Sequence, residues 1–345
     1  MPEVLITGGS GFFGGVLKRQ LLADGFTVSN IDLVQDPDRH VALTSVQGDL
    51  RETSGLARVF DGHRFDAIFH CAAILAHGRI PDREIWSANV DGTRNLAEAG
   101  RKAGVPKFIF LSSNCLWGHN LGRPVREDDA PAPVETYGRS KLAAEGVLAG
   151  YTQAMDVTIL RSPTIISSGR LGLLAILFEF IQENRTVWVV GSGGNRYQFI
   201  YAPDLVQACL AGMRSTGSDI FHVGSDHVQS LRAVYEAVIR KAGSRSRVRS
   251  LPKAPTLAAM RMAHLLRVSP LGPYHYKMIA EDFVFDTARI KERLGWRPTL
   301  SNAEMLSEAY SYYAERRSEI EARRDVSAHS RPAEMGIVRL VKWLS

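Results

Sequence analysis

A tyrosine and a lysine four residues apart are the first candidates for chemistry in this chain, in the stretch YGRSK from Tyr137 to Lys141. On a helix, residues at this spacing share one face, with their Cβ atoms about 5–6 Å apart. The Lys141 ammonium would then stabilise the ionised form of the Tyr137 phenol, whose ordinary pKa is about 10. The pair would make a general acid. An unrelated surface pair has the same spacing, so the rest of the chain must decide.

A glycine-rich loop after the first apolar segment predicts a dinucleotide site. Gly8, Gly11 and Gly14 are spaced three apart in TGGSGFFGG, between a strand-like EVLIT and a helical pattern. Such glycines allow a tight turn and bring backbone N–H groups at a helix N-terminus to a pyrophosphate. Asp32 closes the next strand, where its carboxylate would accept both ribose hydroxyls and repel a 2′-phosphate. We therefore expect NAD rather than NADP.

Alternating strands and helices must position these residues. Short β-branched runs at 3–7, 27–32, 67–72, 107–113 and 157–162 are separated by helical patterns at 14–23, 56–60, 89–103 and 137–149. Such alternation implies right-handed crossovers and a parallel sheet covered on both faces. We expect an α/β, doubly wound parallel (Rossmann) sheet with a smaller C-terminal substrate-binding region. The expected division is an NAD-binding domain at 1–162 with part of 200–225, a substrate-binding region at 163–318 and a tail at 319–345.

Composition limits the partners of the chain. Its 345 residues are 45% hydrophobic and 23% charged, without an apolar run long enough to span a membrane. The N-terminus leads straight into a strand, so a cytoplasmic protein is expected. The three cysteines form no C-x-x-C pair, so neither a metal site nor a disulfide framework is expected.

The net charge of +6 concentrates at 240–253 and after Arg316. No aromatic-interleaved basic stripe accompanies it, so no nucleic-acid partner is expected. An anionic surface on the inner face of the membrane, contacted peripherally, and a plain solvated face both remain open.

Several motifs in order resemble those of the extended short-chain dehydrogenase/reductase family, which includes nucleotide-sugar epimerases, dehydratases and 3β-hydroxysteroid dehydrogenases. They are TGGSGFFG, NIDL, GDL, HCAA, NVDGTRNL, LSSNCLWG, YGRSK, LRSPTI and LGWRPTLSNAEML, and they cover about residues 3–315. The resemblance implies that Tyr137 is the general acid/base, that Lys141 lowers its pKa and holds the cofactor ribose, and that Ser113 hydrogen-bonds the substrate oxygen. Hydride transfer to a ketone develops an alkoxide, which needs these two donors.

The resemblance also implies which residues line the cofactor cleft. Asp49 and Leu50 would flank the adenine, residues 71–73 would line the cleft, and Asn89 would support it or take part in a proton relay. A homodimer built on two helices per subunit is a further expectation. The cofactor-binding residues implied are Gly8, Gly11, Phe12, Phe13, Gly14, Asp32, Asp49, Leu50, Cys71, Ala72, Ala73, Asn89, Tyr137, Lys141 and Pro163.

Departures from the family pattern bear on the substrate. Sugar-nucleotide dehydratases carry an acidic pair just after the catalytic serine or threonine, whereas this chain has Asn114 and Cys115. Dehydration is therefore not expected. Many of the epimerases hold the substrate diphosphate with an asparagine and an arginine, whose positions here are Thr164 and Tyr197. Both losses weaken the case for a nucleotide sugar, although Arg196, one place out of register, would compensate for one of them.

Apolar segments and the C-terminal tail favour an amphiphilic substrate. The segments at 169–181 and 256–266 are hydrophobic, with core packing as the ordinary alternative. As a helix, the tail from Ala333 would set apolar residues opposite Arg339 and Lys342. Such a helix suits an anionic membrane surface, and packing on the protein or on a dimer partner is an equal alternative. The pattern resembles bacterial ceramide-pathway reductases, which reduce a 3-oxo lipid to a 3-hydroxy lipid.

The function predicted is NAD(H)-dependent reduction of a lipid ketone, with Tyr137 as proton donor. The main alternative is a nucleotide-sugar 4-epimerase, in which Tyr137 and Ser113 oxidise and re-reduce one carbon while NAD stays bound. A non-catalytic, NAD-sensing regulator is a third class. The intact set of Ser113, Tyr137 and Lys141 argues against it.

Overall fold

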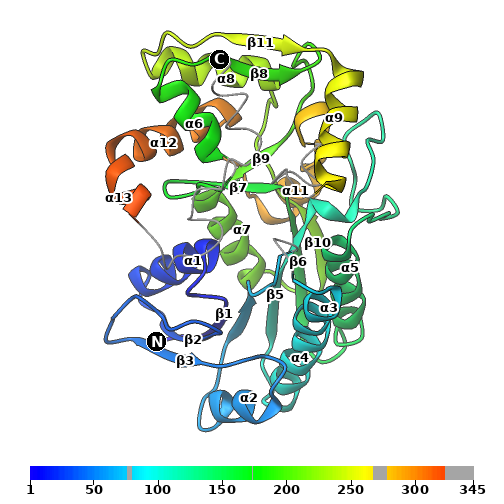
Figure 1. Cartoon of the computed structure of the whole chain (residues 1–345). Coiled ribbons are helices and arrows are strands. Elements are labelled where there is room, and N and C mark those ends of the chain that lie inside the picture. The colour runs from blue at the N-terminus through cyan, green and yellow to red at the C-terminus, as the bar shows by residue number, and fades with distance from the viewer. Residues whose placement is uncertain (76–79, 173, 267–277, 323–345) are drawn as a thin grey trace.

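A seven-stranded parallel sheet forms the larger part of the molecule (Figure 1). The computed structural model describes residues 1–75, 80–172, 174–266 and 278–322. The strand order β10-β6-β5-β4-β1-β2-β3 confirms the predicted doubly wound Rossmann arrangement. The strands are β1 (Glu3–Thr7), β2 (Thr27–Asp32), β3 (Leu43–Gln47), β4 (Ala67–His70), β5 (Lys107–Ser113), β6 (Asp156–Ser162) and β10 (Asp219–His222).

Helices cover both faces of this sheet, and each face has its own core. One face packs apolar side chains of α1 (Phe12–Ala23) and α7 (Ala202–Arg214). The other packs α2 (Thr53–Phe60), α4 (Gly92–Lys102) and α5 (Thr136–Ala149). A short helix α3 (Asp82–Trp86) and a π-helical turn η1 (Ser87–Asp91) lead into α4. Because both faces are covered, the central strands are buried and read as continuous apolar runs.

The C-terminal region forms a second, smaller layer over the carboxyl ends of the strands (Figure 1). Its two small parallel sheets pair β8 with β11 and β7 with β9. Its elements are β7 (Thr164–Ile166), α6 (Leu174–Gln182), β8 (Val187–Val190), β9 (Phe199–Tyr201), α8 (Leu231–Lys241), β11 (Val248–Leu251), α9 (Lys253–Leu265), α11 (Ala288–Leu294), α12 (Asn302–Glu315) and α13 (Arg317–Ala322).

The two apolar segments noted in the sequence differ in burial. Helix α6 packs into the core of the C-terminal region, where Phe178 and Ile181 are fully buried. The residues of α6 therefore follow the ordinary core interpretation. Helix α9 is instead largely exposed, with Met262 and Leu265 among the exposed apolar side chains.

The two regions are not separate along the chain. Ile290 of α11 and Trp296 pack in the core beneath the Rossmann sheet, although they fall in the segment predicted to bind substrate. The Trp296 indole donates to the Asp204 carbonyl at 2.8 Å, which anchors the late part of the chain to α7. Within the described ranges, no helix has the length and apolar character needed to cross a membrane. The predicted amphipathic tail from Ala333 lies outside the described residues.

Candidate active site

Helix α5 brings Tyr137 to Ser113 at the carboxyl end of β5. Gly138 makes this approach possible, since a Cβ there would lie 2.2 Å from the Cys115 carbonyl oxygen. The first turn of α5 therefore packs directly against η2 (Asn114–Leu116), the turn that follows Ser113. The Ser113 side chain lies close enough to the Tyr137 hydroxyl to lower its pKa. The two predicted catalytic hydroxyls thus lie together at the edge where an open α/β sheet binds its ligands.

Desolvation shifts the pKa of both members of the catalytic pair, of which Lys141 is buried and Tyr137 is half-buried. Desolvation raises the pKa of the Tyr137 phenol above its usual value, against smaller lowering effects from Ser113 and Arg170. Lys141 is 3% exposed, and burial lowers its pKa to about 8. Its ammonium lies 4.1 Å from the centre of the Phe110 ring. Tyr137 is thus held in the protonated form that a proton donor needs, and the lowering of its pKa by Lys141 stays a prediction.

Asn89 ties the cofactor side of the cleft to the catalytic helix. Its amide oxygen accepts from the Ile74 amide at 2.8 Å, and its nitrogen donates to the Ile74 carbonyl and to Ser140, both at 3.0 Å. Ser140 in turn donates to the Tyr137 carbonyl at 2.8 Å. These bonds use both N–H groups of the amide. Two roles were expected for Asn89, namely support of the cofactor cleft or part in a proton relay. These contacts are of the supporting kind.

A buried chain of hydrogen bonds that sequence reasoning did not identify centres on His70. Thr93 donates to the Asn89 carbonyl at 2.6 Å, so its oxygen must accept from His70 Nε2, at 2.9 Å. His70 Nδ1 then accepts from the Thr7 hydroxyl at 2.7 Å, and Thr7 accepts from the Ala72 amide at 3.3 Å. Only the neutral Nε2–H tautomer satisfies this chain. A signal was present in the sequence, namely a histidine at the end of an apolar strand.

We expect the free energy of unfolding to fall as the pH drops below about 6.5. Burial lowers the folded-state pKa of His70 and of His222 to about 3. The unfolded chain therefore binds more protons between pH 3 and 6.5, at a cost of about 1.4 kcal/mol per pH unit for each histidine. Urea unfolding between about pH 7.5 and 5 measures this slope. The His70→Gln variant should lose about half of this slope. Substitution of the exposed His119 by Gln should leave the slope intact. Equal slopes in the parent and both variants would contradict the assignment.

The glycine loop has the close backbone contacts that a pyrophosphate site requires. Gly8 has a φ of +74°, and its amide donates to the Ile31 carbonyl at 3.0 Å. A Cβ on Gly14 would lie 2.1 Å from the Gly8 carbonyl oxygen. Gly11 caps α1, and the amides of Phe12 and Phe13 belong to the first helical turn, which has no intrahelical acceptors. Glycine is therefore required where the loop meets the start of the helix.

A buried ionic cluster holds this loop from below. Asn30 of β2 accepts from the Gly9 amide at 2.9 Å and donates to Asp36 at 2.7 Å. Lys18 of α1 pairs with Asp36, and both side chains are completely buried. Lys18 also lies 3.0 Å from Asp38. Breaking such a pair leaves a buried charge uncompensated, so the cluster fixes the segment after β2 against the loop.

The remaining predicted cofactor residues lie at neighbouring strand ends. Asp32 accepts from the Ser10 amide at 2.9 Å, which places its carboxylate beside the glycine loop. Leu50 follows the end of β3 and contacts α4 at Gly92, while Asp49 pairs with Arg51, which lowers its pKa. Residues 71–73 follow β4, and Pro163 follows β6 beside Ser113.

These residues fit a dinucleotide. The cradle at Gly8 and Gly14 has no room for a Cβ, and helix N-terminal amides stand above it. Asp32 sits one strand away, where a ribose would lie, and offers no cation to a 2′-phosphate. The glycine loop and Asp32 would hold the cofactor, and NADH would supply a hydride when bound. No group of metal-binding side chains occurs in the described part of the chain.

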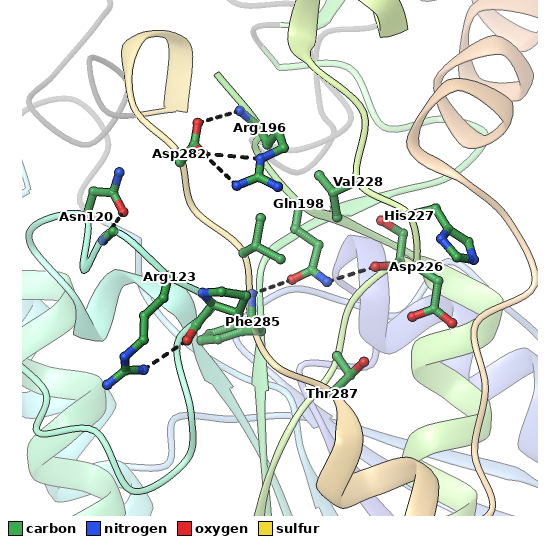
Figure 2. A pocket seen from close by; sticks show the side chains of 14 residues that line it. Asn120, Arg123, Arg196, Gln198, Asp226, His227, Val228, Asp282, Phe285 and Thr287 are labelled. Carbon is green, nitrogen blue, oxygen red and sulfur yellow. Dashed lines mark hydrogen bonds and ion pairs between the residues drawn. The ribbon is translucent and has the colours of Figure 1, made fainter. Parts of the chain in front are cut away.

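Arg196 was expected to replace the arginine with which the epimerases hold the substrate diphosphate, and the structure does not support this. Tyr197 is 1% exposed, and its hydroxyl accepts from the Asn114 side chain at 2.7 Å, next to Ser113. Side chains alternate along an extended segment, so Arg196 and Gln198 point the opposite way. Figure 2 shows Arg196 beside Asp282 in a cavity of the C-terminal region, and the two side chains pair at 3.1 Å. Arg196 therefore does not replace the arginine that the epimerases use.

The cavity that Arg196 lines is separate from the catalytic residues. It has a volume of about 170 Å³. Its lining residues are Asn120, Gly122, Arg123, Pro124, Arg196, Gln198, Ser225, Asp226, His227, Val228, Asp282, Val284, Phe285 and Thr287 (Figure 2). Its charged side chains are paired: Arg123 with Asp129, Arg196 with Asp282, and Asp226 with Lys291. Ser113, Tyr137 and Lys141 are not among its lining residues.

Arg170 is a further charged residue of the site that sequence reasoning passed over. Its guanidinium carbon lies 5.7 Å from the centre of the Phe12 ring, above the glycine loop. The same positive charge acts to lower the pKa of Tyr137. Arg170 thus lies near Phe12, which follows the glycine loop, and its charge reaches the proton donor. The signal in the sequence is a lone arginine inside the apolar stretch at 169–181.

The fold and this site define an enzyme of the Rossmann class that transfers hydride with a nicotinamide cofactor. The model of the NAD dependent epimerase/dehydratase family matches residues 4–224. The uncharacterized protein y4nG of Sinorhizobium fredii is 33% identical over 99% of this chain and 86% of its own length. The chain therefore belongs to the NAD dependent epimerase/dehydratase family, in agreement with the predicted resemblance.

Other relatives show the range of activities in the family. A UDP-glucose 4-epimerase of Mycolicibacterium smegmatis is 28% identical over 90% of this chain and 98% of its own. A 3-beta-hydroxysteroid dehydrogenase of Mycolicibacterium neoaurum is 26% identical over 91% and 92%. Among solved structures, the UDP-glucose 4-epimerase of Thermotoga maritima with UDP-glucose has a TM-score of 0.75 at 23% identity, covering 91% of this chain and 99% of that one. The Bordetella bronchiseptica enzyme WbmG in complex with NAD has a TM-score of 0.74 at 20% identity, covering 91% and 94%.

Proposed function

We propose that this protein is an NAD(H)-dependent oxidoreductase that reduces a ketone on an amphiphilic substrate, of the 3-oxo-lipid class, to a secondary alcohol. The proximity of the Ser113 and Tyr137 side chains carries the proposal. A hydride adds to the carbonyl carbon, the π electrons move to the oxygen, and Tyr137 donates its proton to that oxygen. Ser113 stabilises the developing alkoxide. The raised pKa of Tyr137 keeps the proton in place until the alkoxide forms.

The residues beside the catalytic pair lack the arginine with which the epimerases hold a nucleotide sugar. The position of the epimerase arginine is taken by Tyr197, which is bound to Asn114. Arg196 forms an ion pair with Asp282 on the opposite side of the extended segment from Tyr197. The 3-beta-hydroxysteroid dehydrogenase of M. neoaurum is a relative whose name indicates an apolar substrate. The packing of α6 in the core gives this substrate class no support.

A nucleotide-sugar 4-epimerase is the second candidate, and the relatives favour it. The M. smegmatis protein and the T. maritima structure are both UDP-glucose 4-epimerases. Arg170, which is near Phe12 and acts on Tyr137, also supplies a positive charge that would pair with a substrate diphosphate. In this function Tyr137 would first accept a proton from a sugar hydroxyl and later return it.

One assay separates the two candidates. Purified protein is given NADH with a 3-oxo sphingoid or ceramide lipid in detergent, and separately given UDP-, GDP- and dTDP-sugars with detection of epimers. Stoichiometric loss of NADH with the lipid supports the reductase. Interconversion of sugars without net loss of NADH supports the epimerase and rules out the first candidate. The Tyr137→Phe protein provides the background for both arms.

A further inference from the structure

One stretch of the C-terminal region carries an unbalanced positive charge. Between Glu236 and Glu281 the sequence holds nine lysines and arginines and no acidic residue. Seven of the nine lie in described segments around β11 and α9, and all seven side chains are exposed: Arg240, Lys241, Arg245, Arg247, Arg249, Lys253 and Arg261. No ion pair joins any of them to an acid in the described part of the chain, whereas Arg161 and Arg196 are paired with Glu145 and Asp282. Their charge is therefore available to an external partner.

Helix α9, which follows this stretch through Pro252, exposes its apolar side rather than a polar one. Its half-buried residues, Thr256, Leu257, Met260 and Ala263, lie together on the inner side. The exposed face consists of Ala254, Pro255, Ala258, Ala259, Met262, Leu265 and the adjoining Leu266, with Arg261 at its edge. Met262, Leu265 and Leu266 are 57%, 75% and 64% exposed. A solvated helix of a globular protein shows the reverse pattern, so this face is built to contact something.

We propose that the surface formed by α9 and Arg240–Lys253, here called the α9 surface, docks on an anionic lipid membrane. The exposed leucines and Met262 would enter the boundary between headgroups and acyl chains, while the basic side chains pair with lipid phosphates. Figure 1 shows β11 and α9 together at the end of the molecule opposite α2, away from the edge of β3. This proposal concerns where the protein binds and does not depend on which substrate it reduces.

Charge excludes the nearest competing occupant. The last 23 residues of the chain, 323–345, are apolar enough to cover a helix, but they contain five basic and two acidic residues. Such a segment is repelled by the α9 surface, whereas an anionic lipid layer is attracted to it. A nucleic acid would use the arginines but would gain nothing from Leu265 and Leu266, because phosphate and base contacts are polar or aromatic. The combination of bare positive charge and aliphatic side chains fits a membrane.

Vesicle flotation of the full-length protein tests the proposal. On vesicles of equimolar phosphatidylcholine and phosphatidylglycerol, the triple variant Arg245→Gln, Arg247→Gln, Arg249→Gln should have a partition coefficient about 100-fold below the parent. The double variant Met262→Gln, Leu265→Gln should lose about 10-fold or more. Pure phosphatidylcholine should bind the parent weakly, and added salt should weaken binding to the anionic vesicles.

The matched control removes three exposed arginines elsewhere, in Arg58→Gln, Arg64→Gln, Arg214→Gln. It keeps the same net charge as the test triple and the same C-terminal segment, so it should bind almost as the parent does. Equal binding by both triples, or equal binding of the parent to neutral and anionic vesicles, would overturn the proposal. A third outcome would also overturn the proposal. In it, the arginine triple variant alone loses binding to a structured RNA, while vesicle binding is unchanged in every variant. Turnover measured in detergent should not differ among these proteins, which keeps this result separate from the identity of the substrate.

Discussion

Replacing Tyr137 with phenylalanine is expected to lower kcat by about 10³-fold, within the range for loss of a general acid. The change removes the proton that the alkoxide receives and the interaction of the hydroxyl with Ser113, but it keeps the ring. Binding of NAD should be nearly unchanged, because Lys141 and the glycine loop remain. Steady-state kinetics on the substrate found in the assay above, with a fluorescence titration of NAD, measure both quantities.

Tyr151→Phe is the matched control for this experiment. Tyr151 follows α5 on the outer side of the sheet, where its hydroxyl lies 3.5 Å from Glu98. Its removal should leave kcat within the error of the parent. If Tyr137→Phe retained the turnover of the parent, Tyr137 would not be the proton donor, and the assignment of the whole site would be wrong.

The Gly14→Ala variant is expected to lose NAD affinity by at least about 100-fold and to lose roughly 1–3 kcal/mol of unfolding free energy. The new Cβ would lie 2.1 Å from the Gly8 oxygen, which already accepts from the Gly11 amide at 3.0 Å. The loop must move away from the start of α1 to make room, and this movement disrupts the arrangement of amides that would face a pyrophosphate. Calorimetric titration with NAD and urea unfolding measure the two losses.

Gly146→Ala gives the contrasting result. This glycine is exposed in the middle of α5, and a Cβ there meets nothing within 4 Å. The substitution should stabilise the helix by about 0.5–1 kcal/mol and leave NAD binding unchanged. Similar losses in the two alanine variants would show that the effect at position 14 is general rather than a consequence of the close approach to Gly8.

Most of the sheet could be predicted because central parallel strands are buried on both faces. The segment 107–113 is apolar from Phe108 to Leu111, and its predicted bounds match β5. Strand β3 was missed, since its LTSVQ lies at the sheet edge with every side chain half-buried or exposed. The exposure of α9 could not be predicted either, because an apolar helix facing solvent has the same residue pattern as one facing a core.

The candidate site also has residues that the sequence could predict and others that it could not. Local motifs predicted Ser113, Tyr137 and Asp32, because each stands at the end of a recognisable strand or the start of a helix. The role of His70 depends on Thr7 and Thr93, which are 63 and 23 residues away. The direction of Arg196 depends on which side of an extended segment faces the catalytic pair. Such relations are set by tertiary packing, which sequence spacing does not contain.

The buried pair of Lys18 and Asp36 has a consequence for how the cofactor is captured. Through Asn30, the pair joins the Gly9 amide to a part of the molecule that cannot open without exposing two charges. The loop therefore has its binding shape before any dinucleotide arrives, and association pays little conformational entropy to order it. More of the contact free energy then appears as affinity. A substitution in this cluster would lower the affinity for the dinucleotide without touching it. The free loop would adopt several conformations, and binding would have to select one of them.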